Sequence, residues 1–318
     1  MRIGSFGNSE AMIQQMLRQQ TDLVETQRQV ATGTKYSDVK GFGAGTSSLL
    51  SSHSIMNRLD GFYESNKSIS GRLNAFDHSL TELEGIGNRL RDALFTARGT
   101  GDGTGLVTEI DSLFQQAASI MNTRFEGRFL FGGTQSDQQP LAIGTTTELL
   151  ATAEPPAGNF FNDQGDPNSI RLDERTSVTV GSTASQVGQD LLHSMQRILM
   201  FDAGTLPAGA GAFAPAGDLD QQLTNDQAEF LQSELDRVLG AIDTMKTAAT
   251  DNALNIRTVE DVQTRIEDQK ITLSELIADK EDADLGEAAL RLNQQQVALE
   301  ASFRMIAQMR QLSLVNLL

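Results

Sequence analysis

The sequence contains no cysteine and no tryptophan, and aromatic residues make up only 5% of its 318 positions. Without cysteine, the chain forms no disulfide bond and offers no thiolate ligand to a metal ion. Small-molecule pockets are lined largely by apolar and aromatic side chains, so a low aromatic content disfavours an enzyme that closes around a substrate. These absences point away from a disulfide-stabilised or cysteine-ligated metal protein, and from a pocket-forming enzyme.

Positive charge is also scarce, because 25 lysines and arginines face 42 acidic residues and give a net charge of −17. Binding to nucleic acid, or to an anionic membrane surface, needs basic patches, so we expect this protein to bind neither. The two ends depart from the acidic average: residues 1–40 carry five basic and four acidic groups, and residues 288–318 carry three and one. Copies of an acidic protein repel one another, so self-association is least opposed at these ends.

Long apolar runs and catalytic motifs are absent too. No stretch reaches 18 consecutive apolar residues, so we expect no membrane insertion. The N-terminal residues lack the apolar segment of a cleaved secretory signal peptide. There is no nucleophile elbow and no P-loop, and His53, His78 and His193 are scattered. We therefore predict no enzyme, no catalytic or metal-binding residue and no cofactor. The acidic residues of 279–284 lack the glycine and final glutamate of a calcium-binding loop and are interpreted as a solvated helix junction.

What the sequence does have is a long apolar seam. From Ile55 to Ala97 the seam residues alternate at spacings of four and three, which is typical of a coiled coil. The pattern predicts a helix over residues 49–98, a break at the glycine-rich residues 99–105, and a third helix over 106–120 that returns antiparallel. The same spacing resumes from Leu231 to Ala249. We predict a rod whose core contains Ile55, Leu59, Phe62, Ile69, Leu73, Phe76, Leu80, Leu83, Leu90, Leu94, Leu235, Val238 and Ile242.

The two ends carry weaker seams, in which glutamine or serine interrupts the apolar residues. Residues 10–31 repeat at Ile13, Met16, Gln20, Leu23, Gln27 and Val30, and a last helix, capped by Asp284, repeats at sevens from Leu285 to Ile306. Such seams suit segments that gain their apolar partner from neighbouring copies. The predicted subunit-assembly residues are Ile13, Met16, Leu23, Val30, Leu292, Leu299, Phe303 and Ile306.

The middle of the chain reads as turns and short strands. Arg128–Phe131 is a β-like run, residues 169–181 alternate as a hairpin, and residues 203–218 form a flexible connector. Thr183 with Gln186, and Thr224 with Gln227, match capping boxes that start helices. The predicted fold is mainly α with a β-rich insert: a long antiparallel helical rod or coiled coil formed by the N- and C-terminal segments, and a smaller irregular β-containing middle domain.

Five segments follow from this pattern. Residues 1–48 form an N-terminal assembly helix and loop, and residues 49–126 form the N-terminal part of the rod. Residues 127–217 form an outer β-rich domain, residues 218–284 form the C-terminal part of the rod, and residues 285–318 form a C-terminal assembly helix.

Several short segments resemble the bacterial flagellin superfamily. They are the opening Met1-Arg2-Ile3, the run from Gln29 to Lys35, and the acidic turn from Glu281 to Asp284. The segment from Gly127 to Gln135 and the ending from Gln294 to Phe303 are most similar to hook-associated protein 3, the FlgL-type hook–filament junction family. The resemblance covers roughly residues 1–135 and 220–318, and residues 36–48 depart from it.

This resemblance implies a structural component of the bacterial flagellum that self-assembles through its terminal helices. It implies export through the flagellum by a type III apparatus without a cleaved signal, and an extracellular location at the hook–filament junction. It further implies hook-associated protein 1 and flagellin as neighbours, and a cytosolic export chaperone. A filament-forming flagellin and, from another class, an intracellular coiled-coil scaffold remain the alternatives.

Overall fold

The computed structural model describes residues 3–153, 159–162, 166–206 and 217–315. By its internal contacts the chain divides into two units. Unit 1 comprises residues 1–60 and 267–318, and unit 2 comprises residues 61–266. Two long helices, α2 (Thr46–Thr100) and α6 (Asn225–Glu281), have residues in both units. Unit 1 also contains α1 (Ile3–Thr32), the 3-10 helix η1 (Val39–Gly45) and α7 (Leu285–Val315).

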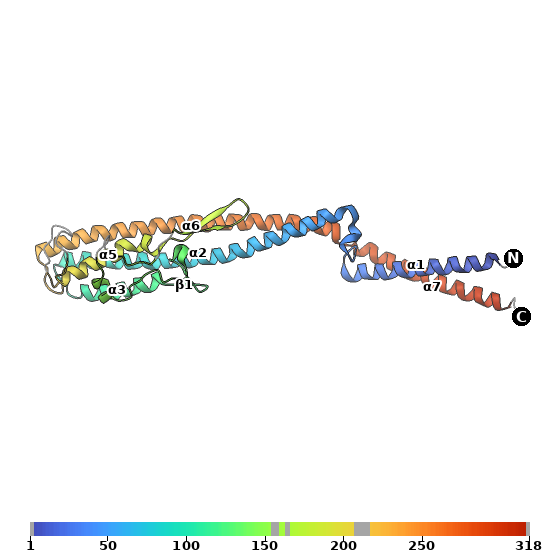
Figure 1. Cartoon of the computed structure of the whole chain (residues 1–318), viewed down its shortest axis with the longest axis horizontal. Helices are drawn as coiled ribbons and strands as arrows, with labels where there is room; N and C mark the ends of the chain where they lie inside the picture. The colour runs from blue at the N-terminus through green and yellow to red at the C-terminus, as the bar shows by residue number, and fades with distance from the viewer. Residues whose placement is uncertain (1–2, 154–158, 163–165, 207–216, 316–318) are drawn as a thin grey trace. The chain divides into compact units, whose positions relative to one another are not determined.

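Unit 2 adds shorter helices and two hairpins to its segments of α2 and α6 (Figure 1). The helices are α3 (Leu106–Met121), the 3-10 helix η2 (Gly133–Gln135), α4 (Thr146–Ala151) and α5 (Ala184–Asp202). In the described part, β1 (Arg124–Phe125) pairs with β2 (Arg128–Phe129), and β3 (Asn168–Arg171) pairs with β4 (Ser177–Val180), both antiparallel. The predicted mainly α fold with a small β-containing insert is confirmed.

In unit 2, α2 and α6 run antiparallel, as the seam predicts. Asn252 Nδ2 donates to the carbonyl oxygen of Leu73 at 3.0 Å, and the Lys246 ammonium lies 4.0 Å from Glu84. Residue numbers therefore rise along α2 as they fall along the neighbouring α6, which is the antiparallel arrangement. The glycine break is also confirmed: α2 ends at Thr100 and α3 begins at Leu106. Arg89 of α2 donates to Gln116 of α3 at 2.8 Å, so α3 returns alongside α2.

Side-chain caps fix the starts of three helices where the sequence places them. Thr183 Oγ1 accepts from Gln186 N at 3.3 Å, while Gln186 Oε1 accepts from Thr183 N at 3.1 Å. Thr224 and Gln227 make the same reciprocal pair at the start of α6, and Asp284 accepts from Glu287 N at 3.0 Å at the start of α7. Each cap satisfies amide groups that the first helical turn leaves without a partner.

The middle segment differs from its prediction in one place. The strand expected at Arg128–Phe131 ends at Phe129. Leu130 N still donates to Thr123 O in the register of the hairpin, but the next carbonyl, that of Phe131, accepts from Ala184 N. The Phe131 carbonyl therefore helps to start α5 instead of extending a sheet. The hairpin predicted at 169–181 is present as β3 and β4. Of the predicted connector 203–218, residues 207–216 lie outside the described residues.

The β3–β4 hairpin is fastened to both long helices by side chains. Asn66 of α2 donates to the Leu172 carbonyl at 3.1 Å, and Asn255 of α6 donates to the Thr179 carbonyl at 2.8 Å. Arg265 pairs with Asp173, whose carboxylate also accepts from the backbone amides of the turn. Burial opposes the charge on Asp173, but these hydrogen bonds outweigh it and lower the pKa to about 2.

A buried ion pair lies inside unit 2. Arg197 of α5 donates to Glu234 of α6 at 2.7 Å, and both side chains are almost fully buried. Arg237 lies 3.3 Å from the other carboxylate oxygen. Beside the pair, the rings of Phe201 and Phe230 stack with centroids 4.0 Å apart. The negative charge of Glu234 is thus compensated in a place that water does not reach.

Two glycines on α2 give a matched test of packing. An added Cβ at Gly87 would lie 2.8 Å from Ile242 Cγ1, whereas at Gly85 it would meet nothing within 4 Å. We expect Gly87→Ala to destabilise unit 2 by about 1–3 kcal/mol through overpacking. Gly85→Ala should stabilise it by roughly 0.5–1 kcal/mol, because alanine loses less backbone entropy in a helix. Urea denaturation of both variants measures the difference, and equal effects would contradict the close approach of α2 and α6.

His193 should make unit 2 sensitive to mild acid. Burial, with Arg237 and Arg197 nearby, lowers its pKa from 6.5 to about 4, although Asp190 opposes the shift. Between these pH values the unfolded chain takes up a proton that the folded chain does not, so stability falls as the pH falls from about 6.5 to about 4 and is unaffected above. His193→Asn should flatten this slope in denaturation curves, whereas His78→Asn, at an exposed position, should leave it unchanged.

Candidate assembly surface

The terminal helices α1 and α7 pack closely against each other within unit 1 (Figure 1). They run antiparallel: Thr34, just after α1, pairs with Asp282, just before α7, and further along Ser302 Oγ donates to Gln19 Oε1 at 3.0 Å. These two contacts give the orientation and the facing sides of both helices.

One stripe on each helix faces the other, and we call these two stripes the inner seam. On α1 it comprises Met12, Met16, Gln19, Leu23, Thr26 and Val30. On α7 it comprises Ala288, Leu292, Gln295, Leu299, Ser302 and Ile306. Every member is buried or half-buried, and both stripes keep the alternating spacing of four and three that brings side chains to one face of a helix.

The predicted assembly residues fall into two groups. Met16, Leu23, Val30, Leu292, Leu299 and Ile306 lie in the inner seam. Ile13 and Phe303 lie outside it and are 47% and 49% exposed. The sequence pattern places Ile13, Gln20 and Gln27 in the α1 seam, whereas Met12, Gln19 and Thr26 occupy those places in the structure. The two sets differ by one residue along the helix, and both satisfy the same periodicity.

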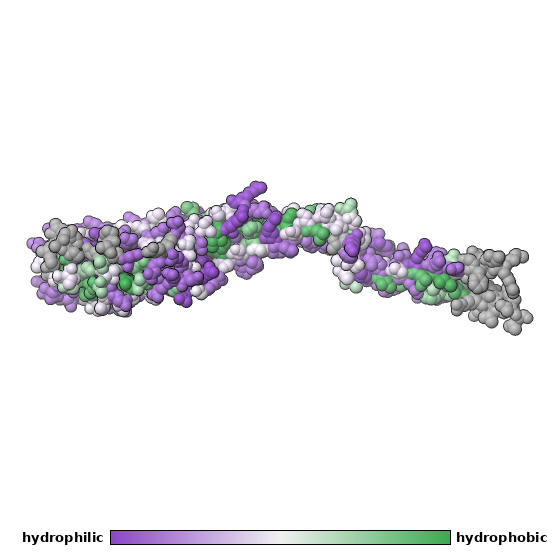
Figure 2. All heavy atoms as spheres, viewed as in Figure 1, coloured by the Kyte–Doolittle hydropathy of each residue, from purple (hydrophilic) through white to green (hydrophobic). Residues whose placement is uncertain are grey.

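Unit 1 leaves most of its apolar side chains in contact with solvent (Figure 2). Among the described residues its buried hydrophobic side chains are Leu49 and Ala288, whereas unit 2 contains a large core. Of the 16 large hydrophobic residues described as exposed, 13 belong to unit 1: Ile13, Leu17, Val24, Tyr36, Leu50, Ile55, Ile271, Leu276, Leu285, Leu290, Val297, Phe303 and Met305. Exposed apolar area of this extent marks an interaction surface.

The predicted rod core is mostly buried, and its exposed end belongs to unit 1. Buried members are Ile69, Leu73, Phe76, Leu80, Leu83, Leu90, Leu94, Leu235, Val238 and Ile242. Leu59 and Phe62 are half-buried, and Ile55 is 37% exposed. The seam of α2 thus begins as an open stripe and becomes an interior only where the other elements of unit 2 cover it.

Backbone hydrogen bonds join the two connectors of unit 1, a contact that the sequence pattern does not reveal. Lys35 N donates to Glu281 O, and Ala283 N donates to Gly33 O, each at 2.7 Å. Around them Lys35 Nζ donates to the Asp279 carbonyl at 2.6 Å, and His53 Nε2 lies 2.7 Å from Glu281. The acidic segment 279–284 is therefore a helix junction, as predicted, and three of its residues, Asp279, Glu281 and Ala283, bind the loop that follows α1.

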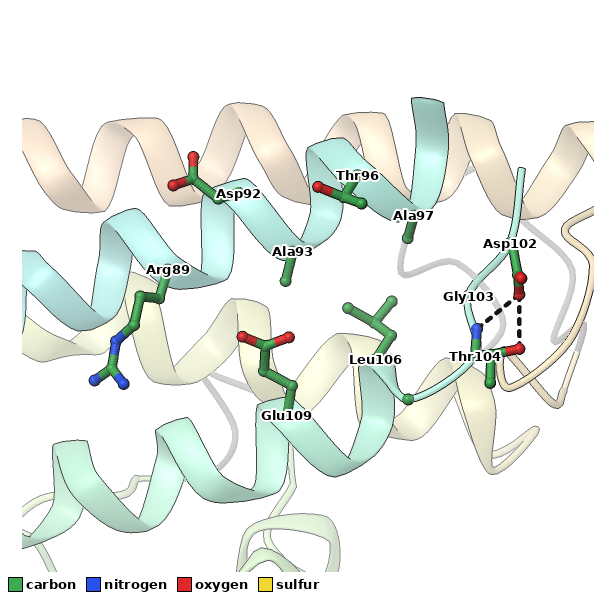
Figure 3. A pocket seen from close by; sticks show the side chains of 11 residues that line it. Arg89, Asp92, Ala93, Thr96, Ala97, Asp102, Gly103, Thr104, Leu106 and Glu109 are labelled. Carbon is green, nitrogen blue, oxygen red and sulfur yellow. Dashed lines mark hydrogen bonds between the residues drawn. The ribbon is translucent and has the colours of Figure 1, made fainter. Parts of the chain in front are cut away.

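A cleft lies between α2 and α3 in unit 2. It encloses about 450 Å³. The side chains that line it include Arg89, Leu106 and Glu109 (Figure 3). At its edge the Asp102 carboxylate accepts from the Thr104 hydroxyl at 2.7 Å and from the Thr104 amide at 3.0 Å, and these bonds lower its pKa. Asp102 is thus engaged in the turn between two helices. Across the described ranges, no three His, Asp or Glu side chains gather closely enough to hold a metal ion.

The helices are not of a kind that would cross a lipid bilayer: within the described ranges, none has a sufficiently long apolar stretch. The exposed apolar stripes of unit 1 alternate with polar residues, which is typical of helices that pack against other helices.

No protein-family model matches the sequence, and a search of curated proteins found no relative. Solved structures do resemble it. A structure described as a flagellar hook-associated protein from Vibrio parahaemolyticus has a TM-score of 0.58 at 13% identity, over 74% of this chain and 97% of that one.

Two further structures are more distant. Bacillus cereus FlgL has a TM-score of 0.47 at 14% identity, over 67% of this chain and 97% of that one. Hook-associated protein 3 from Legionella pneumophila has a TM-score of 0.36 at 13% identity, over 81% and 98%. Over most of its length, therefore, this chain has the fold of the Vibrio flagellar hook-associated protein.

Proposed function

We propose that this protein is a structural component of the bacterial flagellum, and that it forms the adaptor between hook and filament. The observation that carries the proposal is the contrast between the two units: unit 2 has a closed core, whereas unit 1 exposes 13 large hydrophobic residues, eight of them on the terminal helices α1 and α7. The fold shared with a flagellar hook-associated protein supports the same role. No catalytic residue or cofactor is part of the proposal.

The mechanism is packing between copies. Covering a leucine, isoleucine or phenylalanine side chain contributes about 1.5–3 kcal/mol. Association costs roughly 4–15 kcal/mol in lost freedom of motion, so several such side chains per subunit suffice to hold an assembly together. Unit 1 has enough exposed hydrophobic side chains for this, since 13 large ones are exposed there. Among the described residues of unit 2 only three are exposed, which is too few to hold copies together.

The five predicted segments take roles within this proposal. Residues 1–48 and 285–318 are the assembly segments, and residues 49–126 and 218–284 form the rod. Residues 127–217 are the outer β-rich domain. The proposed partners are other copies of the chain, with hook-associated protein 1 and flagellin as neighbours, and a cytosolic chaperone that covers the apolar ends before export. Export is proposed to proceed by the type III route without a cleaved signal peptide, to an extracellular position at the hook–filament junction.

Deletion of the gene tests the role. We expect cells with intact hooks, without filaments and without motility, that release flagellin into the medium. Normal filaments in the deletion strain would overturn the junction role. A protein found only inside the cell, and absent from sheared flagella, would instead favour an intracellular coiled-coil scaffold.

A filament-forming flagellin is the nearest alternative, since it would use the same terminal helices. Purified protein mixed with salt or with filament seeds separates the two. A flagellin grows into long filaments, whereas a junction protein should not elongate by itself.

A further inference from the structure

Helix α1 carries a second stripe beside the inner seam. Ile13, Leu17 and Val24 are 47%, 54% and 63% exposed, and Gln20, Gln27 and Ala31 complete the spacing of four and three. We call these residues the α1 stripe. Each lies one position after a member of the inner seam, which is a rotation of about 100° around the helix. The α1 stripe therefore faces a different direction from the side that packs against α7.

Helix α7 carries a shallow groove on the face turned away from α1. The groove encloses about 430 Å³ and is lined by Leu290, Asn293, Gln294, Val297, Ala298 and Ala301, which we call the α7 groove. Leu290 and Val297 are 60% and 62% exposed. They precede the seam residues Leu292 and Leu299 by two positions, and two positions correspond to about 200° around a helix. Its own α1 therefore does not cover this groove.

We propose that the α1 stripe of one copy docks into the α7 groove of a second copy; this inference rests on the proposed function and names the contact that carries it. Leu17 and Val24 lie seven residues apart, as Leu290 and Val297 do. The side chains of the α1 stripe therefore recur along the helix at the same interval as the residues that line the α7 groove. The larger side chains of the stripe meet a groove with the small Ala298 and Ala301. Gln20 and Gln27 also bring amides that can pair with Asn293 and Gln294.

Charge favours a second copy as the occupant. Unit 2 contains 14 basic and 28 acidic residues, whereas unit 1 contains 11 and 14. Copies brought together through unit 2 would repel strongly, and copies brought together through unit 1 would repel little. Because stripe and groove lie on different helices, each copy offers one of each, and such a heterologous contact repeats into a ring or a helical array.

Because the chain has no cysteine of its own, every disulfide bond in a cross-linking test must come from the introduced cysteines. Full-length chains with two distinguishable tags would each carry one cysteine, in the pairings of Leu17→Cys or Val24→Cys with Leu290→Cys or Val297→Cys. After assembly and oxidation we expect mixed-tag disulfide dimers in at least one pairing. We expect few dimers from Leu17→Cys mixed with itself. The matched control is Gln19→Cys with Ser302→Cys in one chain, because these side chains touch across the inner seam and should cross-link within the monomer.

Charged substitutions give a second, independent measurement. Leu17→Glu and Val297→Glu should each lower the amount of the protein recovered in sheared flagella about tenfold or more, since each 1.4 kcal/mol of lost binding is a factor of ten. Both positions are exposed in the monomer, so the melting curve should not change. Assembly that survives both substitutions, or cross-links only between identical positions, would overturn this inference and leave the proposed function standing. A wild-type chain that never assembles with flagellar proteins would overturn both.

Discussion

A chain that lacks residues 1–35 should fail to assemble while unit 2 still unfolds in a cooperative transition. The deletion removes α1, and with it one side of the inner seam and the partner of α7. Unit 2 keeps its core, because the buried cluster from Phe76 to Met245 contains no residue of α1 or α7. Incorporation into flagella, measured in sheared preparations, should drop to background. Thermal unfolding followed by circular dichroism should keep the transition of the core.

The matched control uses an exposed apolar residue of unit 2. Leu254 is 55% exposed, comparable to Leu17, but lies outside unit 1. Leu254→Ser should leave assembly intact, and deletion of residues 285–318 should abolish it as the first deletion does. Normal incorporation of a chain without residues 1–35 would show that the terminal helices do not carry assembly.

Glu234→Ala should destabilise unit 2 by about 3–5 kcal/mol, the largest effect that we expect from a single substitution. The change leaves the guanidinium of Arg197 buried without its carboxylate, because the Arg197 side chain is only 6% exposed. A buried charge that loses its partner costs far more than the same charge at the surface. Chemical denaturation at neutral pH measures the loss directly.

Two controls separate burial from charge. Glu82→Ala removes the exposed partner of His78 and should change stability by no more than about 1 kcal/mol. The double variant Arg197→Met with Glu234→Leu removes both charges and should recover most of the stability, since well-packed apolar pairs can replace a buried ion pair. A Glu234→Ala chain as stable as the wild type would mean that water or another group reaches Arg197.

The helices were predictable because their signals are local. The seam spacing, the glycine break before Leu106 and the caps at Thr183, Thr224 and Asp284 each depend on residues a few positions apart. The sequence does not decide which of two stripes on α1 faces α7. The stripe through Met12 and Gln19 and the stripe through Ile13 and Gln20 have the same period, and only the position of α7 distinguishes them.

Contacts between distant segments could not be read from the sequence. The hydrogen bonds between Lys35 and Glu281, and between Gly33 and Ala283, join backbone atoms, so no pattern of side chains in the sequence predicts them. The pair of Arg197 with Glu234 joins two helices that a connector separates, and charged residues on amphipathic helices are usually solvated. Asn66 occupies an apolar seam position, and its role as donor to the β3–β4 hairpin depends on where that hairpin folds back.

The close approach of Ile242 to Gly87 also limits how the long helices can align. An apolar seam with a seven-residue repeat tolerates sliding of one helix along the other by a heptad, since each apolar side chain then meets another. A slip of one heptad would bring Ile242 opposite Leu80 or Leu94 instead of Gly87. Even an added Cβ at Gly87 would lie 2.8 Å from Ile242 Cγ1, so a leucine in that place does not fit. Overpacking of this kind costs about 1–3 kcal/mol, enough to make a slipped pairing a minor population. A single glycine therefore selects one alignment of α2 and α6 from several that hydrophobic contact alone would accept.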